Sequence, residues 1–216
     1  MESSTHSASH LGTVLRSPTF PILLRNIEPG DAETMSTLFS DPRNAEHDPA
    51  VSAMTVSVAS SAIGRMRESA AVPSILSLPA GDVVSGPGRV NLVVVYVDSN
   101  TPEVEGVMIG FAGFGDIKTL QEGGKQVRVG DVGVMLNPDF RGKGYGVEAI
   151  KLSVEWGFRG ILEGGLQLDR ITATMRTGNT AMVGLVEKKL GWQATKRLGE
   201  GGQEELLYSV LPDAWK

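Results

Sequence analysis

A strand, a glycine-rich loop and a helix follow one another directly over residues 131–159, and this succession constrains the fold more than any other part of the chain. The strand is predicted to end at Leu136, and the helix to run from about Gly144 to Arg159. Backbone N–H groups at a helix N-terminus lack intrahelical partners and lie at the positive end of the helix dipole. Glycines let a ligand approach the backbone closely. The segment therefore predicts a cradle for a phosphate or pyrophosphate, and with it a phosphorylated cofactor.

Helical spacing supports the predicted helix. One face is apolar and carries Val147, Ile150, Val154 and Phe158. The opposite face carries Glu148, Lys151, Glu155 and Arg159, with opposite charges three and four residues apart. We expect the apolar face in the core and the charged face in water.

Composition excludes several classes of protein. The chain has 216 residues and a formal net charge of −5, so no overall positive charge attracts nucleic acid. It has no cysteine, which excludes disulfides and thiolate chemistry, and two of its three histidines lie within the first ten residues, which disfavours a histidine-based metal site. No apolar run approaches the roughly 18 residues that span a bilayer. We expect a cytoplasmic protein, the nucleus included, without a membrane partner.

Two segments lack the pattern of a helix or strand. Residues 1–17 are rich in Ser, Thr and His and resemble neither a signal peptide nor a transit peptide, so we expect a disordered tail. Residues 72–90 hold three prolines and three glycines, and are predicted to be a long loop that is either a lid or an insertion. Residues 18–216 are predicted to form a single domain.

The remaining elements indicate an α+β fold. A strand at 21–27 precedes helices within 32–41 and 54–70, and three strands follow at 91–97, 107–114 and 126–136. After the long helix come a strand at 170–175, a helix at 179–190 that Gly191 caps, and a hairpin over 192–210. The order is β-α-α-β-β-β-α-β-α-β-β. Three strands in succession favour a mixed, mostly antiparallel sheet flanked by helices.

Two motifs in this order resemble the GNAT superfamily of N-acetyltransferases. Arg141, Gly144 and Gly146 fall on the pattern Arg/Gln-x-x-Gly-x-Gly/Ala of its acyl-CoA-binding core, and residues 137–140 resemble the branch related to ribosomal-protein alanine acetyltransferases. Residues 179–192 resemble the second cofactor-contacting helix of the family. The resemblance implies a GNAT-like fold, acetyl-CoA (coenzyme A) as the cofactor and transfer of an acyl group to an amine.

The resemblance also implies roles for individual residues. Backbone groups of Val134, Met135 and Leu136 would pair with the pantetheine arm, while Asn179 would contact it from the second helix or cap that helix. The amides of the loop would hold the pyrophosphate; its residues are Arg141, Gly142, Lys143, Gly144, Tyr145 and Gly146.

Catalysis needs a group that accepts the proton of the amine. Asp131 is the candidate, because it is predicted to begin the cofactor strand, where relatives often carry a carboxylate. A structural role for Asp131 stays open, as do a water chain, Glu103 and Glu105 as alternative bases. Relatives often place a tyrosine in the second helix as the proton donor, whereas this chain has none there, and Tyr208 on the last strand is a distant substitute. Relative to the family's pattern for this helix, Lys189 resembles a one-residue insertion.

Three functions compete. The first is an acyl-CoA-dependent N-acetyltransferase acting on a protein N-terminus, a lysine or a small-molecule amine. The second is a non-catalytic acyl-CoA-binding or partner-binding domain on the same fold, and the third a nucleotide-binding α/β protein with a parallel sheet. We expect an amine acceptor as partner, no nucleic acid and no metal, and leave a homodimer open.

Overall fold

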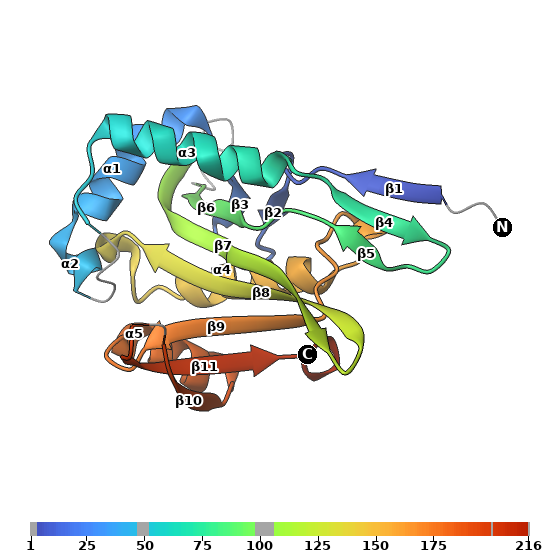
Figure 1. The fold of residues 1–216 in the computed structure, drawn as a ribbon. Helices are drawn as coiled ribbons and strands as arrows, with labels where there is room; N and C mark the ends of the chain where they lie inside the picture. The colour runs from blue at the N-terminus through green and yellow to red at the C-terminus, as the bar shows by residue number, and fades with distance from the viewer. Residues whose placement is uncertain (1–3, 47–51, 98–105, 200, 216) are drawn as a thin grey trace.

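An eight-stranded sheet forms the centre of the protein (Figure 1). The computed structural model describes residues 4–46, 52–97, 106–199 and 201–215. Across the sheet, the strands lie in the order β10 (Ala194–Leu198), β11 (Glu204–Val210), β9 (Arg170–Arg176), β8 (Lys125–Leu136), β7 (Val107–Glu122), β6 (Val90–Tyr96), β3 (Ile22–Asn26) and β2 (Val14–Arg16). All neighbours are antiparallel except β8 and β9, which are parallel. The predicted mixed, mostly antiparallel α+β fold is confirmed, and the parallel α/β alternative is wrong.

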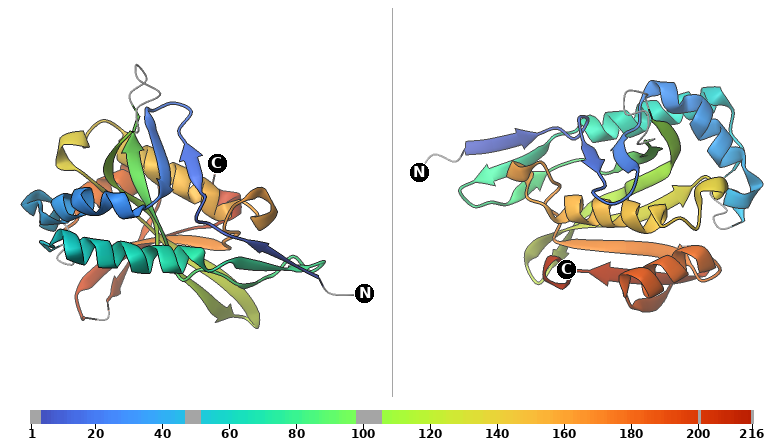
Figure 2. Two further views of the ribbon diagram at one scale, coloured as in Figure 1. Left: turned by 90° about the horizontal axis from the view of Figure 1, so that it is seen from above. Right: turned by 180° about the vertical axis from the view of Figure 1, so that it is seen from behind.

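Helices cover both faces of this sheet. Helix α4 (Tyr145–Phe158) packs on one face, and α1 (Ala32–Ser40) and α3 (Val56–Ala71) pack on the other (Figure 2). The short α2 (Pro42–Ala45) follows α1, and α5 (Thr180–Gly184) continues into the π-helix η4 (Leu185–Lys189). The 3₁₀ turns are η1 (Pro29–Asp31), η2 (Pro138–Phe140), η3 (Ile161–Glu163) and η5 (Pro212–Ala214).

Burial on both faces explains the continuous apolar run of β6. Leu92 and Val94 join the core under α4, while Val93 and Val95 join the core under α1 and α3. Because successive side chains of a strand point to opposite faces, a strand covered on both sides needs apolar residues at every position.

Helix α4 lies close to the sheet because of a glycine. A Cβ atom on Gly157 would lie 2.6 Å from the Phe114 ring and 2.8 Å from Ile171. The apolar face of α4 is buried as predicted at Ile150 and Val154. Glu148 departs from the prediction of a solvated charged face: it is buried and accepts a hydrogen bond of 2.6 Å from the Ser17 hydroxyl.

A second, three-stranded sheet replaces both segments expected to lack regular structure. Strand β1 (Ser4–Ala8) pairs with β4 (Ser74–Leu78), which pairs with β5 (Val83–Ser85), and Figure 1 shows this sheet projecting beyond the end of α3. The prediction of a loop over 72–90 is therefore wrong, because 74–85 form a hairpin. The prediction of a disordered tail is wrong for residues 4–17, because β1 and β2 are paired there; residues 1–3 lie outside the described residues.

A buried polar contact joins the N-terminal segment to the small sheet. The side chain of His10 is 1% exposed, and its Nε2 lies 2.8 Å from the Ser74 hydroxyl, which is fully buried. Burial, with the charge of Arg128 as a lesser cause, lowers the pKa of His10 to about 4. The histidine is therefore neutral in the folded protein at physiological pH.

The β7–β8 hairpin is longer than predicted. Strand β7 extends to Glu122 and β8 begins at Lys125, so the segment 115–125 is mostly strand instead of a loop. Asp131 consequently lies in the middle of β8 and does not begin it.

Candidate active site

Strands β8 and β9 are paired over three residues only, and their separation creates a gap in the sheet. The pairs are Val129–Arg170, Gly130–Ile171 and Asp131–Thr172. Beyond the Asp131–Thr172 pair, β8 continues to Leu136 and β9 continues to Arg176, but the two strands are no longer paired with each other. Backbone groups on this side of β8 are thus not paired with β9 and face a gap that a ligand can enter.

The register of β8 on β7 indicates which backbone groups face the gap. The Asn137 N–H donates to the Ile109 carbonyl at 2.7 Å, and Met135 lies opposite Phe111. Hydrogen-bonded positions alternate along an antiparallel pair. Val134 and Leu136 therefore direct their backbone groups toward the gap, whereas those of Met135 are directed toward β7.

The glycine-rich loop after β8 ends in an uncapped helix. Gly142 and Gly144 have φ angles of 75° and 87°, which favour glycine, and Gly144 is the N-cap of α4. No side chain caps this helix. The N–H groups of its first turn therefore remain available for an anion, and the helix dipole favours a negative charge there.

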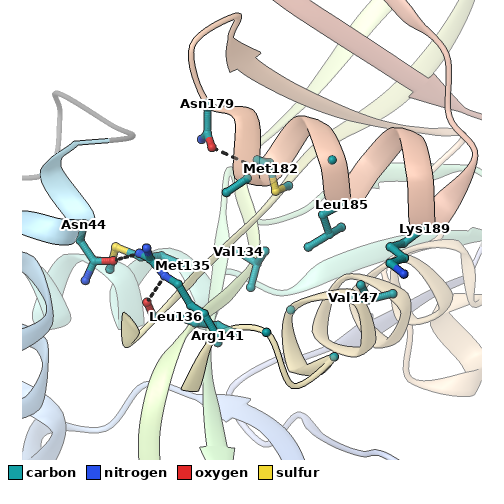
Figure 3. Close-up of a pocket in the computed structure, with 15 residues that line it drawn as sticks. Asn44, Val134, Met135, Leu136, Arg141, Val147, Asn179, Met182, Leu185 and Lys189 are labelled. Carbon is teal, nitrogen blue, oxygen red and sulfur yellow. Dashed lines mark hydrogen bonds between the residues drawn. The ribbon is translucent and has the colours of Figure 1, made fainter. Parts of the chain in front are cut away.

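A cavity of about 410 Å³ lies between this loop, β8 and the helix formed by α5 and η4 (Figure 3). It is lined by Asn44, Val134, Met135, Leu136, Arg141, Gly142, Gly144, Gly146, Val147, Asn179, Ala181, Met182, Gly184, Leu185 and Lys189. The charged side chains among these are Arg141 and Lys189, and none is acidic. The cavity is therefore suited to an anionic ligand with an apolar portion.

A second cavity, of about 270 Å³, lies beside the gap between β8 and β9. Its lining includes Asn91, Asp131 and Thr174, and it shares four residues with the first cavity: Val134, Met135, Asn179 and Met182. The two cavities therefore meet where β8 and β9 separate. A ligand in one can react there with a ligand in the other.

Asp131 is the one ionisable residue among those that line the second cavity. Its Oδ1 accepts hydrogen bonds from the hydroxyls of Thr172 (2.7 Å) and Thr174 (3.0 Å), and no described group donates to Oδ2. Burial raises the pKa of Asp131 above its ordinary value of 3.8, although both threonine bonds oppose the shift. A raised pKa makes the carboxylate a better proton acceptor near neutral pH.

Most residues that the sequence predicted for the cofactor line the first cavity. Arg141, Gly142, Gly144, Gly146 and Asn179 lie there together with residues 134–136. Asn179 is also the N-cap of α5, because its side chain accepts from the Met182 N–H at 3.1 Å.

Two residues of the predicted loop point their side chains elsewhere. The Lys143 ammonium lies 5.0 Å from the centre of the Phe140 ring, and Tyr145 packs edge-on against Phe20 and tilted against Tyr96. Neither lines the first cavity. Their predicted contact with the cofactor therefore involves only their backbone N–H groups and not their side chains.

Tyr208 lines neither cavity and is an unsuitable proton donor. Its hydroxyl donates to Glu187 at 2.9 Å, and its side chain is fully buried. Burial and Glu187 together raise the pKa of Tyr208 to about 12. The earlier suggestion of Tyr208 as a substitute proton donor is therefore wrong.

Sequence reasoning missed the residues that reach the site from other elements. Asn44 is buried in α2, and its Oδ1 accepts a hydrogen bond from Arg141, which also donates to the Leu136 carbonyl at 3.3 Å. Asn91 lies on β6 in the second cavity, and its Oδ1 is buried without a partner. No local motif marks either residue.

In the part of the chain that the structure describes, no three His, Cys, Asp or Glu side chains group so as to hold a metal ion. Likewise, none of the described helices has the length and apolar character needed to cross a membrane.

The sheet opens between two parallel strands beside a glycine-rich loop and an uncapped helix start, and this arrangement defines a ligand site suited to an anion. The family model described as "Acetyltransferase (GNAT) domain" matches residues 22–193, and the chain belongs to this family. The predicted family is confirmed. Membership implies acyl transfer to an amine.

Individual relatives share the fold at low sequence identity. The ribosomal-protein-S5-alanine acetyltransferase from Vibrio fischeri is 21% identical with a TM-score of 0.63, and the match covers 94% of this chain and 99% of that one. RimJ of Mycobacterium smegmatis, solved with CoA-disulfide, is 19% identical with a TM-score of 0.62, covering 93% and 87%. An N-acetyltransferase 9-like protein of Caenorhabditis briggsae is 39% identical over 66 residues, which are 30% of this chain and 31% of that protein.

Proposed function

We propose that this protein is an N-acetyltransferase that moves an acetyl group from acetyl-CoA to a primary amine, which is a protein N-terminus, a lysine side chain or a small molecule. The observation that carries the proposal is the meeting of two cavities at the gap between β8 and β9. One has the features of a cofactor site, and the other holds a carboxylate with a free oxygen.

The first cavity fits coenzyme A by its chemistry. Free N–H groups at the start of α4 suit a pyrophosphate, the outward backbone groups of Val134 and Leu136 suit the amides of pantetheine, and no lining residue is acidic. A Cβ atom on Gly146 would lie 3.2 Å from Leu185, so the cavity is narrow there. When bound, acetyl-CoA supplies an acyl group activated as a thioester.

The second cavity is proposed to hold the acceptor. The nitrogen of the amine attacks the carbonyl carbon of the thioester, the carbon–sulfur bond breaks, and the thiolate leaves. Asp131 Oδ2 takes the proton from the amine directly or through one water. An N–H of β8 that faces the gap stabilises the negative charge developing on the carbonyl oxygen.

Binding of the cofactor is tested by calorimetry with coenzyme A and acetyl-CoA. We expect a Kd on the order of micromolar, which corresponds to about 8 kcal/mol. Gly146→Val would place a branched side chain between α4 and Leu185, and we expect it to abolish binding while the protein remains folded. Gly64→Val is the matched control, because nothing lies within 4 Å of a Cβ at Gly64.

Turnover distinguishes the enzyme from a binding domain on the same fold. The lining of the first cavity contains Leu185 and no tyrosine, so the described residues offer no tyrosine as a proton donor there, and this favours the binding domain as second candidate. Release of free thiol from acetyl-CoA with a panel of peptides, amino acids and alkylamines supports the enzyme. Micromolar binding without turnover for any amine would support the binding domain, and no binding at millimolar ligand would refute both.

The identity of the acceptor is left to that panel. One solved relative is a spermidine N-acetyltransferase of Vibrio cholerae, and another acetylates an alanine of a ribosomal protein, so the fold does not determine the acceptor. A cytoplasmic location, nuclear location included, stays a prediction from the sequence, as does a single domain over 18–216.

A further inference from the structure

Two adjacent lysines end the helix that closes the cofactor cavity. The helix changes from α to π geometry at Leu185, and its π turn ends at Lys189, which the resemblance to the family marks as a one-residue insertion. A π turn accommodates an extra residue within a helix whose ends are fixed. Here the end is fixed by Trp192, which is buried, and by Gly191, whose φ of 72° closes the helix. Lys189 lines the cavity, whereas Lys188 does not.

The ammonium group of Lys189 has no carboxylate partner. None of the ion pairs among the described residues includes it. The nearest acid in sequence, Glu187, accepts from Tyr208 on the other side of the helix. The other cation of the cavity, Arg141, donates to Asn44 and to the Leu136 carbonyl. Of the two cations that line this cavity, Lys189 is therefore the one without a hydrogen-bond or ion-pair partner among the described residues.

Lys189 also lies at a distinct end of the cavity. Figure 3 shows Asn179, Met182, Leu185 and Lys189 in succession along the helix, with Asn179 and Met182 at the end shared with the second cavity. Lys189 lies at the opposite end, beside Val147 in the first turn of α4. The N–H groups of the loop lie between these ends and suit the pyrophosphate. A cation beyond them suits a further phosphate on the same ligand.

We propose that Lys189 binds the 3′-phosphate of coenzyme A and makes the site prefer coenzyme A to dephospho-coenzyme A. The inference rests on the proposed function, since it assumes that the first cavity takes coenzyme A. The two ligands share pantetheine, pyrophosphate and adenosine, and they differ by that phosphate alone. A compact ammonium on a flexible stem forms this kind of contact with a phosphate.

The test is calorimetry of both ligands with the wild-type protein and three variants at low ionic strength. We expect the wild type to bind coenzyme A about 5-fold more tightly than dephospho-coenzyme A, in the range for one exposed ion pair. Lys189→Met removes that preference by weakening coenzyme A alone. Lys189→Arg retains it. Lys188→Met, which removes the same charge one residue away, retains it too.

Each other result overturns the inference. Equal affinity of the wild type for both ligands would mean that the site does not recognise the 3′-phosphate. Equal weakening of both ligands in Lys189→Met would place the ammonium on the pyrophosphate, and the same loss in Lys188→Met would reduce the effect to general charge. In all of these the proposed function stands, because coenzyme A still binds. Failure of the wild type to bind either ligand at millimolar concentration would refute both proposals.

Discussion

Replacement of Asp131 by Asn tests the proposed chemistry most directly. The substitution keeps the shape of the side chain and its Oδ1, so the bonds of 2.7 Å and 3.0 Å from Thr172 and Thr174 can persist. It removes the basic Oδ2 at the second cavity. We expect kcat/KM for the amine to fall roughly 10²–10⁴-fold, the usual contribution of a general base. The Kd for acetyl-CoA should not change, because Asp131 does not line the first cavity.

The pH dependence gives a second readout. Because burial raises the pKa of Asp131 above 3.8, the wild-type rate should rise with pH through that raised pKa and again as the free amine loses its proton. Asp131→Asn should lack the first rise. Its deficit should shrink at high pH, where the amine is already neutral.

Stability separates a catalytic from a structural role. A carboxyl whose pKa is raised in the folded state contributes stability below its unfolded pKa and loses it as pH rises through the folded pKa. At pH 7, well above its unfolded pKa, Asp131 therefore lowers the stability of the fold, and Asp131→Asn should melt at the same or a higher temperature than wild type. That advantage should disappear below about pH 4.

The assay is thiol release from acetyl-CoA with the best amine of the panel, together with thermal melting from about pH 3 to 9. Asp213→Asn is the matched control, because Asp213 is an exposed carboxylate in η5 that lines neither cavity. Wild-type turnover in Asp131→Asn would refute the role as base and leave a water chain, Glu103 or Glu105; these two glutamates lie outside the described residues. A lower melting temperature with little kinetic change would make Asp131 structural.

Two further predictions concern stability. Gly157→Ala should destabilise the fold by roughly 1–3 kcal/mol, because the added methyl group overpacks against Phe114. Gly64→Ala, with open space around the new methyl group, should stabilise α3 by about 0.5–1 kcal/mol. Chemical unfolding measures both free energies, and an unchanged stability of Gly157→Ala would contradict the close packing of α4 on the sheet. His10, with its pKa lowered to about 4, contributes stability that is complete above about pH 6.5 and is lost as pH falls toward 4. Between pH 7.5 and 4.5 the wild type should lose roughly 2–3 kcal/mol more than His10→Asn, and equal losses in urea unfolding would show that His10 is not held neutral.

Local signals were sufficient for the core of the site. The strand ending at Leu136, the glycines with positive φ and the amphipathic α4 are each determined by residues within about ten positions of one another. Periodicity, the conformational freedom of glycine and free amides at a helix start operate at that range, so the sequence by itself determined the strand, the loop, the helix and the kind of ligand they suit.

Tertiary structure decided what surrounds this core. Strand β1 is paired with β4 about 70 residues later, Asn44 reaches Arg141 across 97 positions, and Asp131 is held by threonines more than 40 positions away. A composition rich in serine, proline or glycine predicts a loop from local preferences alone. Such preferences contain no information about a partner strand far away in the sequence, and here pairing with that strand decides the conformation. The position of Asp131 at the gap and the place of Lys189 in the cavity arise from chain segments meeting in space, and long-range contacts of this kind leave no periodic pattern in the sequence.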